Sequence, residues 1–350
     1  MRVLFIVKKR ADYCHEYGQG YGQCDALGGL YNSARFVVQM LNKNGVTAAL
    51  VQVVDNNDID REVAKFKPDI AIIEALWVVP EKFEILAKLH PTVKWVVRIH
   101  SEIPFLAVEG VAIDWICDYV TEKNVTVAAN SIRATDDLRA AISAKRPDVF
   151  VDSMVAYLPN WYPITRVPKP TPNPSILNIA CFGAIRPLKN QLIQALAAIE
   201  FAQRTRKNLH FHINGTRCEQ HGDNVLRNIQ ALFAGTPYTL IEHGWESHDD
   251  FLQSMAGMDV AMAVSFSETF NITTADAVND SVPIVVSSEV AWASPQCFAD
   301  PNNAPSIVAL LDKVTNEPDK SKLVAANLQL LNDYDVASTR TWLAYLKANA

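Results

Sequence analysis

The chain has 350 residues, enough for two domains of ordinary size. Its 49% hydrophobic and 20% charged content is typical of a globular protein with well-filled cores. The net charge of −6 argues against a general polyanion binder, although it permits a local basic patch.

The first element is a short apolar strand, Val3–Val7, which is closed by the basic residues Lys8, Lys9 and Arg10. A signal peptide needs a longer apolar region and a small-residue cleavage site, and this start has neither. No apolar stretch reaches the roughly 18 residues that cross a bilayer. We therefore expect a cytoplasmic protein without a transmembrane segment, while peripheral contact with a membrane stays open.

Strand and helix patterns then alternate through the first half. Apolar, β-rich runs lie at Val3–Val7, Thr47–Val54, Asp69–Glu74, Lys94–Ile99 and Val125–Ala128, and amphipathic stretches at Leu30–Asn42, Ile59–Phe66, Glu81–Leu89 and Ile132–Ala144. Continuous apolar strands separated by helices indicate a parallel sheet with helices on both faces.

The clearest linker is Lys169–Ser175, because prolines at alternate positions sustain neither a helix nor a central strand. After it the pattern begins again. We expect strands at Ile176–Phe182, Leu209–Asn214, Thr239–His243, Asp259–Val264 and Pro283–Ser287, and helices at Gln191–Thr205 and Val225–Phe233. Three helical stretches end the chain, at Ala304–Thr315, Lys320–Asn332 and Val336–Ala348.

The sequence thus predicts an α/β protein with two doubly wound, Rossmann-like domains facing a cleft. Residues 1–168 form the first domain, 169–175 the linker and 176–335 the second domain. Residues 336–350 form a C-terminal helix that is expected to pack back on the first domain. Ligands of doubly wound sheets bind beyond the carboxyl ends of the strands, which makes the cleft the expected site.

The most informative segment is 265–276, Ser-Phe-Ser-Glu-Thr-Phe-Asn-Ile-Thr-Thr-Ala-Asp. A predicted strand ends in a polar loop that carries Glu268, and a helix with Asp276 follows. The N–H groups and dipole at a helix start favour an anion. The two carboxylates would flank that anion and suit hydroxyl-rich groups, such as a sugar and a ribose on either side of a diphosphate.

Two cations follow the first strand of the second half, in Phe182-Gly183-Ala184-Ile185-Arg186-Pro187-Leu188-Lys189-Asn190. Arg186 and Lys189 lie one helical turn apart, beside a new helix, where positive charge opposes the helix dipole. They could neutralise a leaving diphosphate. The alternative is a solvated helix start with ordinary surface charges.

Two further strand ends carry small turns. Ile213-Asn214-Gly215-Thr216 permits close backbone approach to a ligand, or is a plain turn. His243-Gly244-Trp245 suits a loop that frames a nucleoside, or a tight turn with a packed Trp.

Together these residues resemble the donor domain of retaining GT-B glycosyltransferases of the family-4-like group, which use nucleotide sugars. The shared order is Gly183, Arg186, Lys189, Glu268, Phe270, Asp276, Pro283, Ile284 and Val285. The resemblance implies that residues 176–335 bind the nucleotide sugar and that residues 1–168 bind the acceptor. It also implies Arg186, Lys189 and Glu268 as catalytic residues.

The same resemblance assigns sugar hydroxyls to Glu268, the diphosphate to the N–H groups of Asn271 and Ile272, and the ribose to Asp276. Further donor-binding residues are expected at Gly28, Gly29, Gly215, His243, Gly244 and Phe270. The chain departs from the family in two ways. Asp276 replaces a Glu, and Thr269, Asn271 and Ser281 replace glycines. Asn tolerates left-handed backbone angles, which predicts that the loop is kept at Asn271.

In the first half, the glycine pair Gly28-Gly29 before a helix resembles the family's phosphate-approaching glycines, or is a simple helix start. The long connection from Lys8 to Leu27 is predicted to bind the acceptor through Lys8, Arg10, Tyr13, Tyr17 and Tyr21. His100 resembles the family's histidine near the reacting sugar and is predicted as catalytic, with a buried structural role as the alternative. Asn160 resembles a structural Pro-Asn turn.

No metal or cofactor is expected. The triplet Asp58-Ile59-Asp60 opens a predicted helix, where capping explains it. The six cysteines have no Cys-x-x-Cys pair, and the spacing of Cys14, His15 and Cys24 matches no zinc site.

The resemblance implies a glycosyltransferase, either hexosyl or pentosyl, that retains the anomeric configuration. The donor is a nucleotide diphosphate sugar and the acceptor a saccharide or glycolipid hydroxyl. One alternative is a phage DNA-modifying glycosyltransferase, because basic and aromatic residues could line a cleft for a flipped nucleotide. The other is a GT-B-fold sugar-nucleotide epimerase, with Asp25, Glu74 and Glu102 as acid–base carboxylates.

Overall fold

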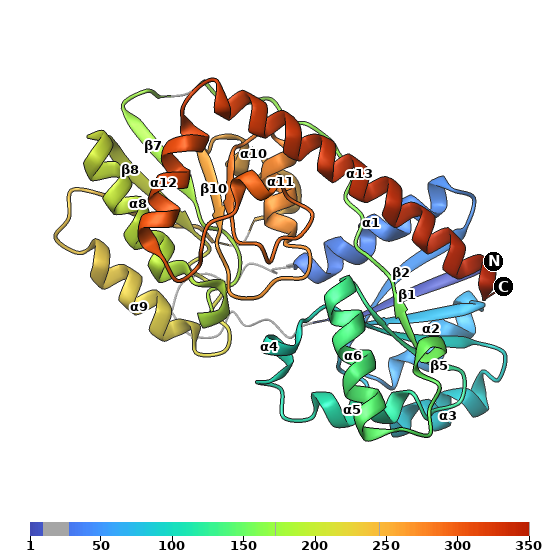
Figure 1. The fold of residues 1–350 in the computed structure, drawn as a ribbon. Coiled ribbons are helices and arrows are strands. Elements are labelled where there is room, and N and C mark those ends of the chain that lie inside the picture. Colours follow the sequence, from blue (N-terminus) through green and yellow to red (C-terminus); the bar gives the residue numbers. More distant parts are fainter. Residues whose placement is uncertain (10–27, 172, 245, 350) are drawn as a thin grey trace. The chain divides into compact units, whose positions relative to one another are not determined.

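The computed structural model describes residues 1–9, 28–171, 173–244 and 246–349. They form two compact units (Figure 1). Unit 1 comprises Met1–Tyr162 and Asp335–Ala350, and unit 2 comprises Pro163–Tyr334. Each unit has its own parallel sheet with helices packed against it, which confirms the predicted fold class of two Rossmann-like α/β units.

The sheet of unit 1 has the strand order β2-β1-β3-β4-β5-β6, and every pair is parallel. Its strands are β1 (Arg2–Lys8), β2 (Thr47–Val53), β3 (Ile70–Glu74), β4 (Lys94–Ile99), β5 (Val125–Ala129) and β6 (Val155–Tyr157). Its helices are α1 (Gly29–Lys43), α2 (Asp58–Phe66), α3 (Glu81–Leu89), α4 (Ile103–Leu106), α5 (Ala112–Tyr119), α6 (Ile132–Lys145) and α7 (Val151–Met154). The prediction lacked β6, α4, α5 and α7, most of which are too short to show a periodic pattern.

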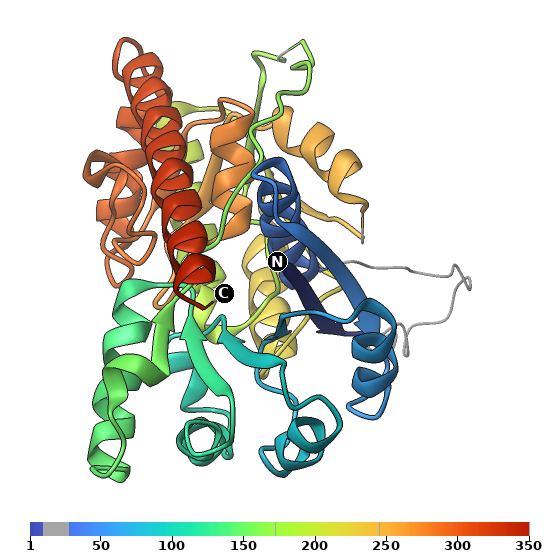
Figure 2. The same cartoon turned by 90° about the vertical axis from the view of Figure 1, so that its right-hand side faces the viewer.

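Both faces of this sheet are buried, as the continuous apolar strands predicted. In β1, Leu4 and Ile6 enter one apolar cluster, while Val3, Phe5 and Val7 enter the other. This alternation follows from the two-residue period of a strand. The second cluster also contains Trp342, whose ring centroid lies 5.7 Å from that of Phe5. Accordingly, the last turns of the C-terminal helix lie near the start of the first strand in both views (Figure 1 and Figure 2).

The structure corrects the helices that were predicted for the C-terminal region. Helix α12 (Ala304–Thr315) is present, but the next two predicted helices are one continuous helix of 30 residues, α13 (Asp319–Ala348). The polar residues near 332–335 suggested a break, yet no Gly or Pro interrupts the segment. Asp335 is buried in this helix, and its Oδ1 accepts the N–H of Tyr162 at 2.9 Å.

The sheet of unit 2 has the order β11-β10-β7-β8-β9, again entirely parallel. Its strands are β7 (Ile176–Ala180), β8 (Asn208–Ile213), β9 (Thr239–Glu242), β10 (Val260–Ala263) and β11 (Ile284–Val286). The other elements are the 3-10 turns η1 (Pro187–Lys189) and η2 (Pro295–Cys297) and the helices α8 (Gln191–Thr205), α9 (Gly222–Phe233), α10 (His248–Ala256) and α11 (Ile272–Asn279). The chain builds outward from β7 to β9 and then crosses back to β10, so the strand order reverses between β7 and β10.

Candidate active site

The reversal point of unit 2 brings together the two segments that the sequence singled out. The loop after β7 leads through Arg186 to η1, and the loop after β10 carries Glu268 and leads to α11. Because β7 and β10 are paired and parallel, both loops leave the same edge of the sheet. This is the position at which doubly wound sheets bind their ligands.

The two loops are joined by an ion pair. Lys189 Nζ donates to Glu268 Oε1 at 2.5 Å, and the side chains are only 16% and 6% exposed. Burial lowers the pKa of the Lys189 ammonium below its ordinary value, Arg186 acts in the same direction, and the Glu268 carboxylate opposes both. The sequence predicted both residues, and the structure brings them into contact.

Two amides hold η1 against the loop after β10. Asn190 has a left-handed backbone, with φ of 58°, and its Nδ2 donates to Val264 O at 3.0 Å. Gln194 Nε2 donates to Lys189 O at 2.8 Å, while Gln194 Oε1 accepts the Val264 N–H at 2.9 Å. These bonds fix the Lys189 backbone before any ligand binds. Neither amide was predicted as a functional residue.

Arg186 lies in a second charged group. Glu219 Oε2 accepts a hydrogen bond from Arg186 Nη1 at 3.3 Å. Glu219 Oε1 accepts two hydrogen bonds from Arg217, one from Nη2 at 2.7 Å and one from Nε at 2.9 Å. Arg186 was predicted, but Arg217 and Glu219 were not. The one sequence feature that could have pointed to Arg217 and Glu219 is their position just after the turn at Gly215.

Asn271 is the N-cap of α11, and it has the left-handed backbone that the sequence predicted for this position. Its φ of 58° is left-handed, and its Oδ1 accepts the Thr274 N–H at 3.0 Å and the Thr273 hydroxyl at 2.8 Å. Ser281, which also stands at a glycine position of the resembled family, has φ of 57°. The loop therefore keeps glycine-like backbone angles without glycine.

Asp276 follows Ile272 by about one turn of α11. Only 1% of it is exposed, and its Oδ1 lies 2.8 Å from Nε2 of His248, the first residue of α10. The prediction included Asp276 but not His248. The partner comes from a helix 28 residues earlier, and no local pattern links the two.

A chain of imidazoles runs across the ends of β8 and β9. His212 Nδ1 lies 2.8 Å from His243 Nε2, and His243 Nδ1 lies 3.3 Å from Glu246 Oε1. Burial, with the neighbouring histidines, lowers the pKa of His212 to about 4, so its ring is neutral at pH 7. Since His212 Nε2 donates to Asn178 Oδ1 at 3.2 Å, its Nδ1 accepts from His243. His243 was predicted, and this anchoring was not.

The predicted glycines of unit 2 have different surroundings. Gly183 has φ of 120°, which disfavours any side chain. A Cβ at Gly215 would lie 2.7 Å from the Cβ of Glu242, so packing within the protein already requires this glycine. A Cβ at Gly244 would meet nothing within 4 Å, and Gly244 is exposed.

Phe270 lies in the core of unit 2 instead of facing outward. It is 2% exposed, and its ring packs 5.2 Å from Tyr334 and 5.7 Å from Trp292. Trp292 Nε1 also donates to Phe270 O at 2.7 Å. The phenylalanine therefore anchors the loop beneath Glu268 and Asn271.

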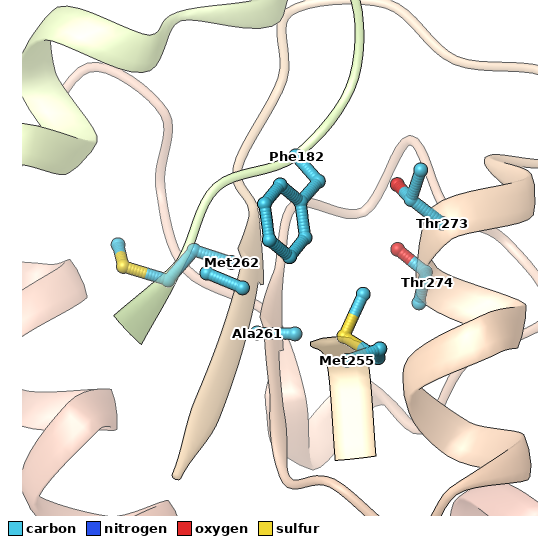
Figure 3. Close-up of a pocket in the computed structure, with 7 residues that line it drawn as sticks. Phe182, Met255, Ala261, Met262, Thr273 and Thr274 are labelled. Carbon is cyan, nitrogen blue, oxygen red and sulfur yellow. The ribbon is translucent and has the colours of Figure 1, made fainter. Parts of the chain in front are cut away.

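A small pocket lies behind the start of α11 (Figure 3). It is lined by residues of β7, β10, α10 and α11 and of the segment after β7, namely Ala180, Phe182, Met255, Ala261, Met262, Thr273 and Thr274. Only the two threonines contribute hydroxyls. The mainly apolar lining assigns this pocket to the packing of unit 2.

In unit 1, His100 belongs to a buried polar group at the ends of β3 and β4. Its Nε2 contacts Glu74 Oε2, and its Nδ1 lies 3.4 Å from Asn130 Nδ2. Burial, reinforced by the charge of Arg98, lowers the pKa of His100, while Glu74 opposes this effect. Burial raises the pKa of Glu74, but Arg98 and His100 outweigh it and hold that pKa below its ordinary value. His100 is thus held as a neutral ring that is 14% exposed.

Three other predicted residues of unit 1 lie at the end of β1 and at the start of α1. Gly28 is the N-cap of α1 and Gly29 its first residue. Lys8 ends β1, is exposed, and has its Nζ 6.0 Å from the centroid of the Trp77 ring. Predicted residues that lie outside the described residues are Arg10, Tyr13, Cys14, His15, Tyr17, Tyr21, Cys24, Asp25 and Trp245.

The epimerase alternative names two carboxylates within the described residues, and both already form ion pairs inside the protein. Glu74 pairs with Arg98 and His100. Glu102 accepts the Ser131 hydroxyl at 2.6 Å and lies 3.3 Å from Arg133 Nε.

The described residues show neither a metal-binding cluster nor a membrane-spanning helix. Within residues 1–9, 28–171, 173–244 and 246–349, no three His, Cys, Asp or Glu side chains are grouped so as to hold a metal ion. None of the helices in this part of the chain combines the length and apolar content that crossing a bilayer requires. Asp58 does open α2, but its Oδ2 accepts the Val54 N–H at 3.0 Å, and Asn57 occupies the cap position.

Comparison with known proteins points to one enzyme class. The model of the family described as "Family 4 Glycosyltransferase in conflict systems" matches residues 133–343, more than half of the chain. No curated protein matches in sequence.

Solved structures share the fold at low sequence identity. An α,α-trehalose-phosphate synthase (UDP-forming) from Burkholderia vietnamiensis has a TM-score of 0.69 and 12% identity, covering 100% of this chain and 97% of that one. An Escherichia coli structure described as trehalose-6-phosphate bound with UDP-2-fluoro glucose has a TM-score of 0.67 and 11% identity, covering 100% of this chain and 99% of that one. Anabaena HepE, in complex with UDP and glucose, has a TM-score of 0.63 and 12% identity, covering 99% of this chain and 99% of that one.

Proposed function

The chain belongs to the family 4 glycosyltransferases in conflict systems, and on that premise we propose that it transfers a sugar from a nucleotide diphosphate sugar to an acceptor hydroxyl with retention of anomeric configuration. We propose a saccharide or glycolipid as the acceptor and the cytoplasm as the location. A uridine diphosphate sugar is the first donor to test, because two structures of similar fold contain UDP or a UDP-sugar.

One observation carries the proposal: the Lys189–Glu268 pair at the reversal point of the unit 2 sheet. A half-buried cation beside a buried carboxylate can address two parts of one ligand. The ammonium suits a phosphate, and the carboxylate suits sugar hydroxyls. Arg186, on the same loop, adds a second cation. The start of α11 adds backbone N–H groups that favour an anion.

These groups support the chemistry as follows. The bond between the anomeric carbon and the phosphate oxygen breaks, and a bond from that carbon to the acceptor oxygen forms on the same face. Lys189 and Arg186 stabilise the negative charge that develops on the leaving diphosphate. The acceptor proton passes to the leaving phosphate oxygen, so the reaction requires no protein nucleophile. Glu268 holds the sugar hydroxyls and orients the anomeric carbon.

The proposal also assigns the other predicted residues. The N–H groups of Asn271 and Ile272 bind the diphosphate, and the loop at His243 and Gly244 frames the base. In unit 1, His100 stays a predicted catalytic residue. No metal is invoked, because two cations and a helix start supply positive charge. The comparisons favour neither the DNA acceptor nor the epimerase alternative.

A thermal-shift screen against UDP-, GDP-, ADP- and CMP-sugars tests the donor site. A ligand at 100 times its Kd stabilises the folded state by about 2.7 kcal/mol, which raises Tm by several degrees. Glu268→Ala should abolish both the shift and the turnover, whereas Asp152→Ala, an exposed carboxylate of unit 1, should preserve both. The assignment fails if no donor shifts Tm and Glu268→Ala leaves turnover intact. The anomeric proton coupling of the product, measured by NMR, tests retention.

A further inference from the structure

Just beyond β10, the backbone of Val264 lies where β7 has already left the sheet. Ala261 is the last residue of β10 that pairs with β7, and Ala263 O bonds to the β11 side, where it accepts the Ser287 N–H at 3.3 Å. Backbone groups of successive strand residues point to opposite neighbours, so the N–H and C=O of Val264 face the place that β7 has left. Val264 is fully buried, and these groups would be costly if unpaired.

Two amide side chains at the start of α8 take the place of the missing strand. Gln194 Oε1 accepts the Val264 N–H at 2.9 Å, and Asn190 Nδ2 donates to Val264 O at 3.0 Å. At its other end, Gln194 Nε2 donates to Lys189 O at 2.8 Å. Gln194 is completely buried, so one amide with both ends occupied joins the end of β10 to the residue that carries the ammonium.

A backbone hydrogen bond ties the same two loops together. The Phe266 N–H donates to Leu188 O at 2.9 Å. The carbonyls of Leu188 and Lys189 are thus both fixed on the segment after β10, and Glu268 follows Phe266 by two residues. The spacing of the Lys189 ammonium and the Glu268 carboxylate therefore depends on where these bonds hold the two main chains.

Resting on the proposed function, we propose that Gln194 is a positioning residue of the donor site, which places the Lys189 ammonium for the diphosphate by holding Lys189 O at the end of β10. The position requires a group that accepts at one end and donates at the other, as a neutral amide does. An apolar side chain of the same length would leave the Val264 N–H and Lys189 O unpaired. A carboxyl could replace the amide only while protonated, because its ionised form has no hydrogen to donate to Lys189 O.

A double-variant cycle on donor affinity tests this assignment. The donor is the nucleotide sugar found by thermal shift, and calorimetry gives its Kd. Lys189→Met should weaken binding by about tenfold, as expected for the loss of a charged hydrogen bond. Gln194→Met should weaken it by about fivefold in the wild-type background but by less than about twofold in the Lys189→Met background, because residues that act as one unit are not additive. A merely structural role would give the same factor in both backgrounds.

A pH series with the conservative variant adds a second readout. Gln194→Glu should bind the donor less tightly than the wild type at about pH 8.5 and approach the wild-type Kd at about pH 5.5, because burial favours the protonated form of the new carboxyl, which can donate to Lys189 O. Gln194→Met should show no such recovery. If Gln194→Met does not fold, this series decides the question.

Asn327 provides a matched control, because it is another buried amide of unit 2 with both ends in use. Its Oδ1 accepts the Ser294 N–H at 2.8 Å, and its Nδ2 donates to Leu323 O at 2.9 Å. Asn327→Leu should lower Tm much as Gln194→Met does, yet leave the donor Kd unchanged.

The outcomes separate the two proposals. If no nucleotide sugar binds the wild type, or Lys189→Met leaves the Kd unchanged, the donor site itself is wrong. If Lys189→Met weakens binding and Gln194→Met has the same effect in both backgrounds, or Gln194→Glu does not recover at low pH, only the assignment of Gln194 is overturned.

Discussion

Arg98 Nη1 donates to both carboxylate oxygens of Glu74 at 3.1 Å, and neither side chain is exposed to solvent. The guanidinium also donates from Nε to Leu158 O at 2.9 Å and from Nη2 to Asn160 Oδ1 at 2.6 Å. Burying two ions costs several kcal/mol each unless their hydrogen bonds are satisfied. The pair therefore connects β3, β4 and the segment after β6 into one unit beneath His100.

Removing one partner should expose this cost. We expect Glu74→Ala to lower the free energy of unfolding of unit 1 by about 3 to 5 kcal/mol, because Arg98 would be left as a buried, uncompensated charge. Denaturant titration monitored by tryptophan fluorescence measures the loss. The exposed pair Lys145–Asp114 provides the control, and Asp114→Ala should cost less than about 1 kcal/mol. Equal losses in the two variants would contradict this account.

Lys189 and Glu268 should act as one group in catalysis. We expect Lys189→Met and Glu268→Gln each to reduce kcat/KM by about 100-fold, because each leaves its partner wrongly placed for the donor. The double variant should lose little more than either single variant, since contacting residues are not additive. Steady-state kinetics with the donor found by thermal shift gives the three values. Lys207→Met, which changes an exposed lysine of unit 2, should leave kcat/KM unchanged, and full additivity would argue against a coupled pair.

Ser281 offers a test of backbone strain. Its φ of 57° is left-handed, which costs a residue with a Cβ about 1 kcal/mol. Replacing Ser281 by glycine would remove this cost, but the greater freedom of glycine in the unfolded chain offsets part of the gain in stability. Ser281→Gly should therefore stabilise unit 2 by about 0.5 kcal/mol, while Ser281→Ala should not. Chemical denaturation of both variants checks this, and a destabilising Ser281→Gly would show that the hydroxyl matters more than the backbone.

Asp335 should make stability depend on pH. Burial raises the pKa of this carboxyl to about 7, and the hydrogen bond from Tyr162 N–H opposes the effect. The folded state therefore binds a proton more readily than the unfolded chain, whose pKa is near 3.8. This contribution to stability is complete below about pH 4 and is lost as pH rises through about 7.

Asp335→Asn removes the titration while keeping an oxygen for the Tyr162 N–H. We expect it to raise stability by about 2 kcal/mol at pH 8 and to change little at pH 4. Tm measured across this range shows whether the variant flattens the profile. Asp333→Asn, an exposed carboxylate two residues away on α13, should leave the profile as it is. A parallel shift at every pH would refute the titration account.

Much of the architecture could be read from local patterns. Apolar runs of strand length, alternating with amphipathic helices, fixed the parallel sheets, because burial on both faces requires continuous apolar strands. Glu268, Lys189 and Asn271 were also recognisable, since each stands directly after a predicted strand end or before a helix. The unusual angle at Asn271 followed from the residue type.

The partners of these residues were decided only by the tertiary structure. Glu219 meets Arg186 and His248 meets Asp276 because the sheet order brings together loops that are 33 and 28 residues apart in sequence. Likewise, the polar stretch around Asp335 reads as a helix end, yet α13 runs through it because a distant N–H satisfies the buried carboxylate. A local sequence sets the period of each element and the chemistry at its ends, whereas strand order determines which ends become neighbours.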